Sequence, residues 1–331
     1  MGNPLEQPLR ALDDWQQRHP VAALPVAVVK KFGDDQAGNY VALLTYYAFV
    51  STFPLLLVLV TLSEIVLGSH PALRERLLQT ALVEFPVVGQ TLQESVRTPT
   101  GSAPALAVGL VAAFWGGSGL AGTVQTVLNS LWLVPRRKWP GFPWNYLRSI
   151  ALLLLLGVGL VLTALMAAFA AAGHLPGLSG TGVHVLSVVL TTAVYCGLFL
   201  LGFRLAVSPE VRTADLVLGA VLSGIAWQVL LTLGGTLASH LYNSREVTGI
   251  FASVLGLLAW FGLQATITVY VVELDIVRAR HLWPRSLTQP PLTPADQDYL
   301  RATAEAEARR PEQHVDVRFD RSAQRPPTAG G

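Results

Sequence analysis

Six long apolar segments, each without Asp, Glu, Lys or Arg, constrain this chain of 331 residues more than any other feature. A helix needs ~20 residues to cross the ~30 Å hydrocarbon core of a bilayer, and every segment is at least that long. Uninterrupted apolar runs also differ from the alternating pattern of a membrane-barrel strand. The sequence therefore predicts an all-α, polytopic membrane protein with six transmembrane helices plus amphipathic interfacial helices. The six segments are residues 40–63, 103–133, 150–172, 183–203, 216–239 and 250–272.

The composition agrees with a fold in a bilayer. Charged residues make up 13% of the chain and hydrophobic residues 52%, whereas a soluble domain carries about 25% charged residues. The single cysteine, Cys196, excludes an intrachain disulfide and a cysteine-based zinc site. Residues 1–20 are polar, so we expect no cleaved signal peptide there.

The distribution of Lys and Arg predicts the orientation of the spans. The arm before the first span, the second and fourth loops and the near part of the tail hold 13 basic residues, and the other loops hold 4. Basic residues gather on the cytoplasmic side of a membrane. We therefore expect both termini in the cytoplasm and residues 68–102 on the outer side.

The chain is expected to divide into three parts. Residues 1–39 form a cytoplasmic arm with an amphipathic helix, because apolar residues recur at helical spacing between positions 20 and 33. This helix either lies on the inner leaflet or packs on the bundle. Residues 40–280 form the six-helix transmembrane domain, whose external segment 68–102 is expected to hold two short amphipathic helices.

The tail, residues 281–331, has a different composition from the rest of the chain. It holds 7 basic and 7 acidic residues and many prolines. We expect a cytoplasmic, largely disordered tail. Within it, Thr293-Pro294 followed by Asp296 predicts the start of a short helix that ends near Ala308.

Polar residues inside the spans are candidates for function, because they cost free energy in lipid. Gln228 and Gln264 lie near the middle of the fifth and sixth spans. They either hydrogen-bond across the helix interface or line a path for substrate. In the first span, Tyr46 and Ser51 precede Pro54, which removes one backbone hydrogen bond and is expected to kink the helix. Pro54 is either an ordinary membrane proline or a functional hinge.

A second group of polar residues gathers at the inner ends of the spans once the orientation is assigned. Gln125 and Asn129 lie toward the end of the second span, Arg204 follows the fourth and Glu273 follows the sixth. They are either ordinary wet helix ends or the lining of a cavity open to the cytoplasm or inner leaflet. In the second case Glu273 needs a cationic or amide partner, for which Arg204 and Asn129 are the candidates.

Four groups of residues resemble the YihY/BrkB family of bacterial inner-membrane proteins, over roughly residues 20–280. They are Tyr46-Tyr47…Ser51…Pro54, Ser118-Gly119…Gln125…Asn129…Trp132, Gly219-Ala220…Trp227 and Gly249…Trp260…Glu273. The resemblance implies a six-helix, multi-pass protein of the bacterial inner (cytoplasmic) membrane whose activity is poorly defined. Some members were once called ribonuclease BN. The seven histidines of this chain form no ligand-spaced pair, and no basic, aromatic-rich surface for RNA is evident.

Three classes of function remain open. A transporter or flippase for a lipid, an envelope precursor or a small solute agrees with the proline of the first span, the glycines and an inner cavity. A non-catalytic scaffold or assembly factor of the envelope needs no cavity and predicts a solidly packed bundle. A membrane enzyme, nuclease included, is the third class. We expect a transporter or flippase in contact with the lipid bilayer, no enzyme activity, no cofactor or metal, and no nucleic-acid partner; the substrate, the coupling ion and the oligomeric state stay open.

Overall fold

The computed structural model describes residues 6–67, 75, 103–172, 180–243 and 250–320, and the regular structure within those ranges is entirely helical. The α-helices are α1 (Glu6–Arg18), α2 (Pro20–Asp34), α3 (Ala37–Leu67), α6 (Ala103–Leu131), α7 (Trp144–Ala172), α8 (Gly180–Ala206), α9 (Thr213–Asn243), α10 (Ile250–Ala279) and α11 (Pro294–Ala306). A single 3-10 turn, Arg136–Lys138, lies between α6 and α7. The all-α prediction is confirmed for this part of the chain.

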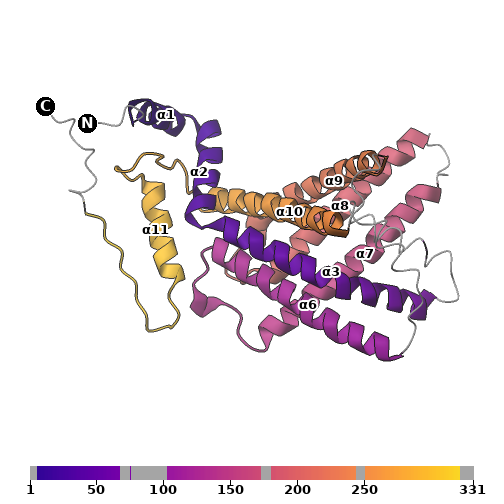
Figure 1. Cartoon of the computed structure of the whole chain (residues 1–331). Helices are drawn as coiled ribbons and strands as arrows, with labels where there is room; N and C mark the ends of the chain where they lie inside the picture. The colour runs from indigo at the N-terminus through magenta and orange to yellow at the C-terminus, as the bar shows by residue number, and fades with distance from the viewer. Residues whose placement is uncertain (1–5, 68–74, 76–102, 173–179, 244–249, 321–331) are drawn as a thin grey trace.

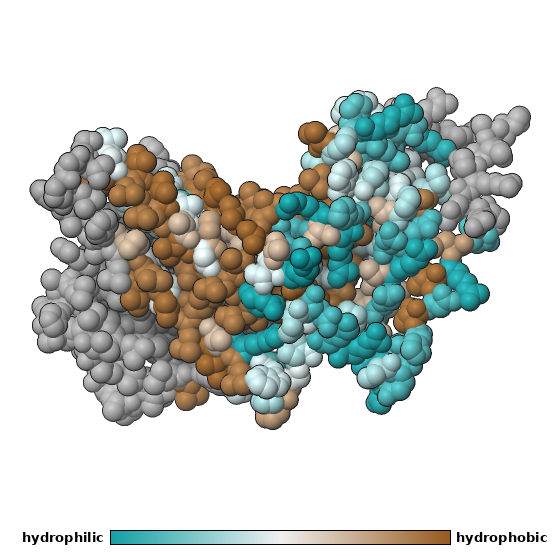
Figure 2. Space-filling model, turned by 180° about the vertical axis from the view of Figure 1, so that it is seen from behind, coloured by the Kyte–Doolittle hydropathy of each residue, from teal (hydrophilic) through white to brown (hydrophobic). Residues whose placement is uncertain are grey.

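Four of these helices are long and apolar enough to cross a membrane: Trp144–Thr163, Thr181–Ala206, Thr213–Gly234 and Val254–Ala279. At most 28% of the residues in their apolar windows are buried, so most of these residues are at least partly accessible, as they are in helices that contact lipid. Figure 2 shows this apolar surface in brown over the bundle. The first two predicted spans fall in α3 and α6, and their role as spans stays a prediction. The helices expected within 68–102 lie outside the described residues, apart from Glu75.

The six long helices form a ring. Each packs against its neighbours in the order α3, α6, α7, α8, α9, α10, and α10 closes the ring by packing on α3 (Figure 1). Helices α8 and α9 approach each other closely because residue 224 of α9 is a glycine. A side chain at Gly224 would overlap the backbone of Cys196 in α8. Large apolar side chains fill one end of the ring, among them Leu131, Trp132, Phe203, Leu216, Val269 and Ile276.

A polar head covers that filled end of the ring. We define the head as α1, α2, α11 and the connecting residues 280–293; Figure 1 shows its three helices together, and Figure 2 shows a hydrophilic surface over this end. Helix α2 packs on both α10 and α3. The packing of α2 on the bundle agrees with the second of the two placements expected for the amphipathic segment 20–33.

Two buried aspartates hold the parts of the head together. Asp13 of α1 accepts hydrogen bonds from the backbone N–H groups of Leu287 (3.0 Å) and Thr288 (3.1 Å). Burial would raise the pKa of Asp13, but these bonds and those from the Gln17 and Gln16 side chains outweigh it, so the pKa lies below its ordinary value.

Asp296 of α11 has the same role on the other side of the head. Burial would raise the pKa of this carboxyl, but the Ser286 N–H, Arg285 and Lys30 all donate to it and lower the pKa instead. Asp296 also forms a capping box with Thr293 at the start of α11. The predicted helix start at Thr293-Pro294 is confirmed, while the boundaries of the three predicted parts of the chain stay predictions.

Candidate functional site

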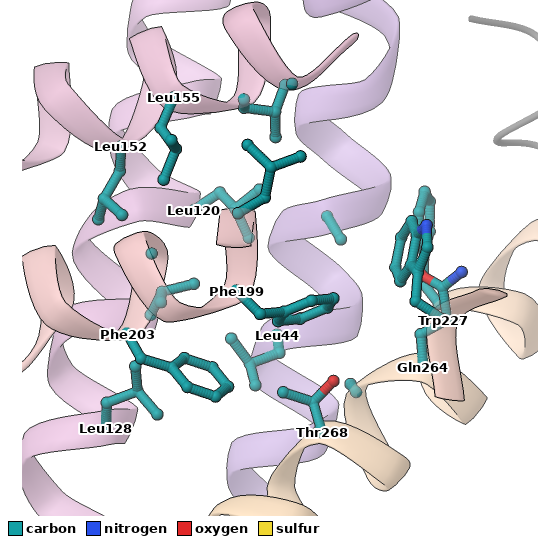
Figure 3. Close-up of a pocket in the computed structure, with 18 of the residues that line it drawn as sticks. Leu44, Leu120, Leu128, Leu152, Leu155, Phe199, Phe203, Trp227, Gln264 and Thr268 are labelled. Carbon is teal, nitrogen blue, oxygen red and sulfur yellow. The ribbon is translucent and has the colours of Figure 1, made fainter. Parts of the chain in front are cut away.

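A cavity of about 460 Å³ lies inside the ring of helices and is lined by residues of all six. Figure 3 shows Phe199 and Phe203 of α8 projecting into it, with Leu152 and Leu155 of α7 on one side and Gln264 of α10 on the other. Most of the lining is aliphatic or aromatic. Its volume falls in the ~300–1,000 Å³ range of small-molecule sites, which are mainly apolar with a few polar groups.

Gln264 is a polar side chain of the cavity lining with an unused donor. Its side chain is 7% exposed, and its Nε2 has no hydrogen-bond partner among the described residues. The hydroxyls of Ser51 and Thr52, also in the lining, donate to the Ala48 carbonyl of their own helix at 3.1 and 2.7 Å. A buried amide without a partner costs free energy, so the Gln264 side chain is suited to bind an acceptor on a molecule in the cavity.

The two glutamines predicted near the middle of the fifth and sixth spans do not bond to each other. The buried Oε1 of Gln228 on α9 has no partner within the described ranges, and neither does the Gln264 Nε2. Of this pair, Gln264 lines the cavity and Gln228 does not. In each side-chain amide, the hydrogen-bond network decides which atom is oxygen and which is nitrogen. If these two atoms were exchanged in both glutamines, the two amides would still form no hydrogen bond with each other.

Two other predicted site residues form hydrogen bonds between helices near the filled end of the ring. The Gln125 side chain of α6 donates to the Ser149 hydroxyl of α7 at 2.9 Å. Asn129, one turn later, donates to the Ala206 carbonyl at 3.0 Å and accepts from the Ser208 N–H at 2.8 Å. These bonds join α6 to α7 and to the end of α8, so both amides are satisfied by protein groups and lie outside the cavity lining.

The remaining candidates lie apart from one another. Tyr46 of α3 is 58% exposed and lies outside the cavity lining. Pro54 lies within α3, which continues to Leu67, and its side chain lies outside the described residues. Arg204 ends α8, and its Nη1 is buried without a hydrogen-bond partner in the described part of the chain.

Glu273 has a cationic partner that the sequence analysis did not name. Its side chain and that of Lys31 in α2 are both fully buried, and the Lys31 Nζ lies 2.7 Å from the Glu273 Oε2. The same ammonium group contacts Asp35 at 2.5 Å and donates to the Leu131 carbonyl at 3.0 Å. Lys31 therefore joins the head to α6 and α10 through two bonds, those to Leu131 and Glu273. Of the expected partners, Asn129 bonds to Ala206 and Ser208, and Arg204 forms no ion pair with Glu273 among the described residues.

The sequence contains a pattern that indicates a buried partner for Lys31. Leu24, Val28 and Lys31 follow the i, i+4, i+7 spacing of one helix face, and Val28 and Lys31 are both buried. A lysine on the apolar face of an amphipathic helix needs a buried partner. That spacing predicts an acidic partner for Lys31 without saying where in the chain the acid lies.

The contacts of Lys31 and Asp35 extend to α11 through Tyr299. Tyr299 donates its hydroxyl to the second oxygen of Asp35 at 2.5 Å, and its pKa lies above the ordinary value because of burial and the nearby Asp35 carboxylate. Arg285 lies over the Tyr299 ring, 4.3 Å from its centroid, and pairs with Asp34 and Asp296 at 2.9 Å each. One continuous network of charges thus links α2, α10 and α11 over the filled end of the ring.

Comparison with known proteins shows where this architecture belongs. Residues 28–294 match the model of the family described as Virulence factor BrkB. The chain belongs to the BrkB family. The resemblance drawn from the sequence is confirmed, and the match extends over α3 to α10 together with the C-terminal part of α2.

Two curated relatives of this BrkB family protein cover most of its length. It is 25% identical over 275 residues to "Inner membrane protein YhjD" of Escherichia coli (strain K12), an alignment that covers 77% of this chain and 80% of that one. It is 25% identical over 272 residues to an uncharacterized protein of Dickeya dadantii (strain 3937), covering 76% of this chain and 81% of that one. No solved structure matches. The candidate spans and the relation to YhjD identify this chain as a multi-pass inner-membrane protein.

Proposed function

We propose that the protein is a transporter or flippase that moves a lipid, an envelope precursor or a small apolar solute through the centre of the six-helix ring. The observation that supports this proposal is the apolar cavity of about 460 Å³ between the ring helices. Its walls favour a hydrocarbon chain or another apolar group, because burial of apolar surface in it is favourable. The free Nε2 donor of Gln264 adds one position at which an acceptor on that molecule is recognised.

The alternative is a non-catalytic scaffold or assembly factor of the envelope. A scaffold acts through its outer surfaces and needs a solid interior, since empty volume in a core lowers stability by ~24 cal/mol per Å³. The cavity therefore favours transport over a purely structural role.

The proposed function includes a topology and a statement about catalysis. We propose that α3, α6 and the four candidate spans all cross the inner membrane, with both termini and the polar head on the cytoplasmic side. The basic residues counted along the chain support this orientation. We also propose that the protein is not an enzyme, since the intramembrane polar groups among the described residues form no nucleophile–base or carboxylate arrangement of the kind hydrolysis requires.

A pair of variants on one helix tests the transport proposal. Ala265→Phe adds a ring to the cavity wall, whereas Leu263→Phe adds one at an exposed position of the same helix. The probe is a phospholipid with a fluorophore on its acyl chain, whose movement between the leaflets of proteoliposomes is followed by a membrane-impermeant quencher. We expect faster movement with wild type and Leu263→Phe, and a protein-free rate with Ala265→Phe. Equal rates with all three proteins and with empty liposomes would contradict transport of this lipid class.

A further inference from the structure

A second buried carboxylate lies two residues after Glu273, and none of the contacts described so far uses it. Asp275 is in α10 within the candidate span Val254–Ala279, and its side chain is 3% exposed. Both of its oxygens lie 2.9 Å from one backbone donor, the N–H of Gly219 in α9. Asp275 therefore belongs to the α9–α10 interface.

The α9 surface is shaped to fit this carboxylate. A methyl group built on Gly219 would overlap the carboxyl group of Asp275, so only a glycine permits the approach. The contact thus combines a backbone N–H that points at the carboxyl group with a space that any side chain at position 219 would fill. Gly219 and Asp275 together define a built site for one carboxyl group.

Asp275 differs from Glu273 in lacking a cation. Glu273 is paired with Lys31 at 2.7 Å, but no lysine, arginine or histidine of the described residues forms an ion pair with Asp275.

Two charged groups act on Asp275 in opposite directions. They are Arg278 of its own helix, which is exposed, and Asp215 at the start of α9, which carries the same sign as Asp275. The others on neighbouring elements have partners of their own. Lys31 and Asp35 face Glu273, and Arg280 donates to the Trp132 carbonyl.

At a buried position without a cation, the ionised carboxylate is much less stable than the neutral carboxylic acid. Moving an isolated ionised carboxylate from water into a low-dielectric interior costs far more than moving the neutral acid, so the group takes up a proton instead. A single backbone amide donor, even charge-assisted, offsets only part of that cost. A carboxyl group inside a transmembrane segment without a cation is the arrangement found in proton relays.

We propose that Asp275 is a proton-binding site: it holds a proton as a neutral carboxylic acid while α9 and α10 are packed together, and gives that proton to water when Gly219 and Asp275 separate. The release leaves the ionised carboxylate solvated, and re-packing of the helices takes one proton up again, so the cycle is balanced. The use of this proton site in transport rests on the proposed function. In that use, the proton is the coupling ion. The existence of the site does not depend on transport.

Infrared spectroscopy of the full-length protein in lipid nanodiscs tests the site without any substrate. We expect a carbonyl band of a protonated carboxylic acid at neutral pH, which shifts in heavy water and disappears on Asp275→Asn. Glu273→Gln is the matched control, because it removes the neighbouring acid that is paired with Lys31, and we expect it to keep the band. Wild-type protein with isotopically labelled aspartate carboxyl groups gives the same assignment without a mutation, since labelling moves an aspartate band and not a glutamate band. Absence of an aspartic acid band, or loss of the band in Glu273→Gln instead, would overturn the proposal.

The coupling is tested separately in proteoliposomes. A pH gradient is expected to change the rate of labelled-lipid movement with wild-type protein and to leave the rate with Asp275→Asn unchanged. Equal responses of the two proteins would overturn the coupling. The infrared result decides the proton site by itself, so failure of the transport proposal and failure of the site are distinguishable.

Discussion

Removing the cation of the buried Lys31–Glu273 pair is expected to be among the most damaging single changes to this protein. Lys31→Met keeps the length of the side chain and its apolar stem but removes the ammonium group. Glu273 is then left fully buried without a partner, and Asp35 keeps only the Tyr299 hydroxyl. Both carboxylates also lie close enough together to repel, since each was within hydrogen-bond distance of the same Nζ atom.

The geometry sets the size and the order of the effects. Removing one partner of a buried ion pair costs ~3–5 kcal/mol, because it leaves an uncompensated charge. Glu273→Gln is expected to cost less than Lys31→Met, since Lys31 keeps Asp35 and the Leu131 carbonyl. The double variant Lys31→Met/Glu273→Met replaces both charges by apolar groups and is expected to recover much of the loss. Lys138→Met is the control, because Lys138 pairs with Glu210 at the surface, with 42% and 52% of the two side chains exposed, and such a pair is worth ~0–1 kcal/mol.

Equilibrium unfolding in mixed detergent micelles gives the comparison. Unfolding by sodium dodecyl sulfate is followed by tryptophan fluorescence for wild type, the single variants and the double variant. Together with the single variant Glu273→Met, Lys31→Met and the double variant form a double-mutant cycle, which isolates the interaction between the two side chains. A Lys31→Met protein that is no less stable than Lys138→Met would refute the reasoning, as would a double variant that is less stable than either single variant.

Three further outcomes are expected. Because the pKa of Asp13 is lower in the folded head than its ordinary value of 3.8, its contribution to the docking of residues 286–288 is present above that value and is lost progressively as the pH falls below it. The measurement is the protection of the Leu287 amide relative to its exchange in an unfolded chain; we expect it to fall at low pH and, at neutral pH, in Asp13→Asn, and unchanged protection would contradict the role of Asp13. In a Cys196→Ser background, a membrane-impermeant thiol reagent applied to whole cells is expected to label Glu75→Cys, and to label Gln313→Cys only after permeabilisation; the reverse pattern would overturn the orientation. Purified protein is expected to cleave no RNA with Mg²⁺, Mn²⁺ or Zn²⁺, and cleavage that survives purification and is lost on mutation of one carboxylate would show an enzyme.

The fold class followed from local sequence, because the apolar segments and the cap of α11 are encoded within short stretches of chain. Thr293 and Asp296 are three residues apart, so their capping box could be expected from spacing alone. The resemblance to the BrkB family likewise depended on short residue groups. The order of helices around the ring had no such local signal, since the outward faces of these helices are apolar as well and give no amphipathic pattern to orient them.

The candidate site was less predictable because its contacts join distant positions. Lys31 and Glu273 are 242 residues apart, and no spacing rule links them. Asp275 lies beyond the predicted span 250–272 but within the candidate span of the structure, where the close packing of Gly219 removes it from water. Gln125 and Asn129 were recognised as unusual residues, but their partners are backbone and hydroxyl groups on α7 and α8, which sequence alone does not place.

The central claim, that an apolar chain enters the cavity of the ring, is tested most directly by photo-crosslinking in membranes. A phospholipid with a photoreactive diazirine on its acyl chain is incorporated, activated by light, and its attachment sites are mapped by mass spectrometry. We expect attachment at cavity residues such as Leu128, Phe199 and Thr268, and loss of these sites in Ala265→Phe but not in Leu263→Phe. Attachment confined to outward-facing positions such as Leu201, with the same pattern in both variants, would contradict the claim.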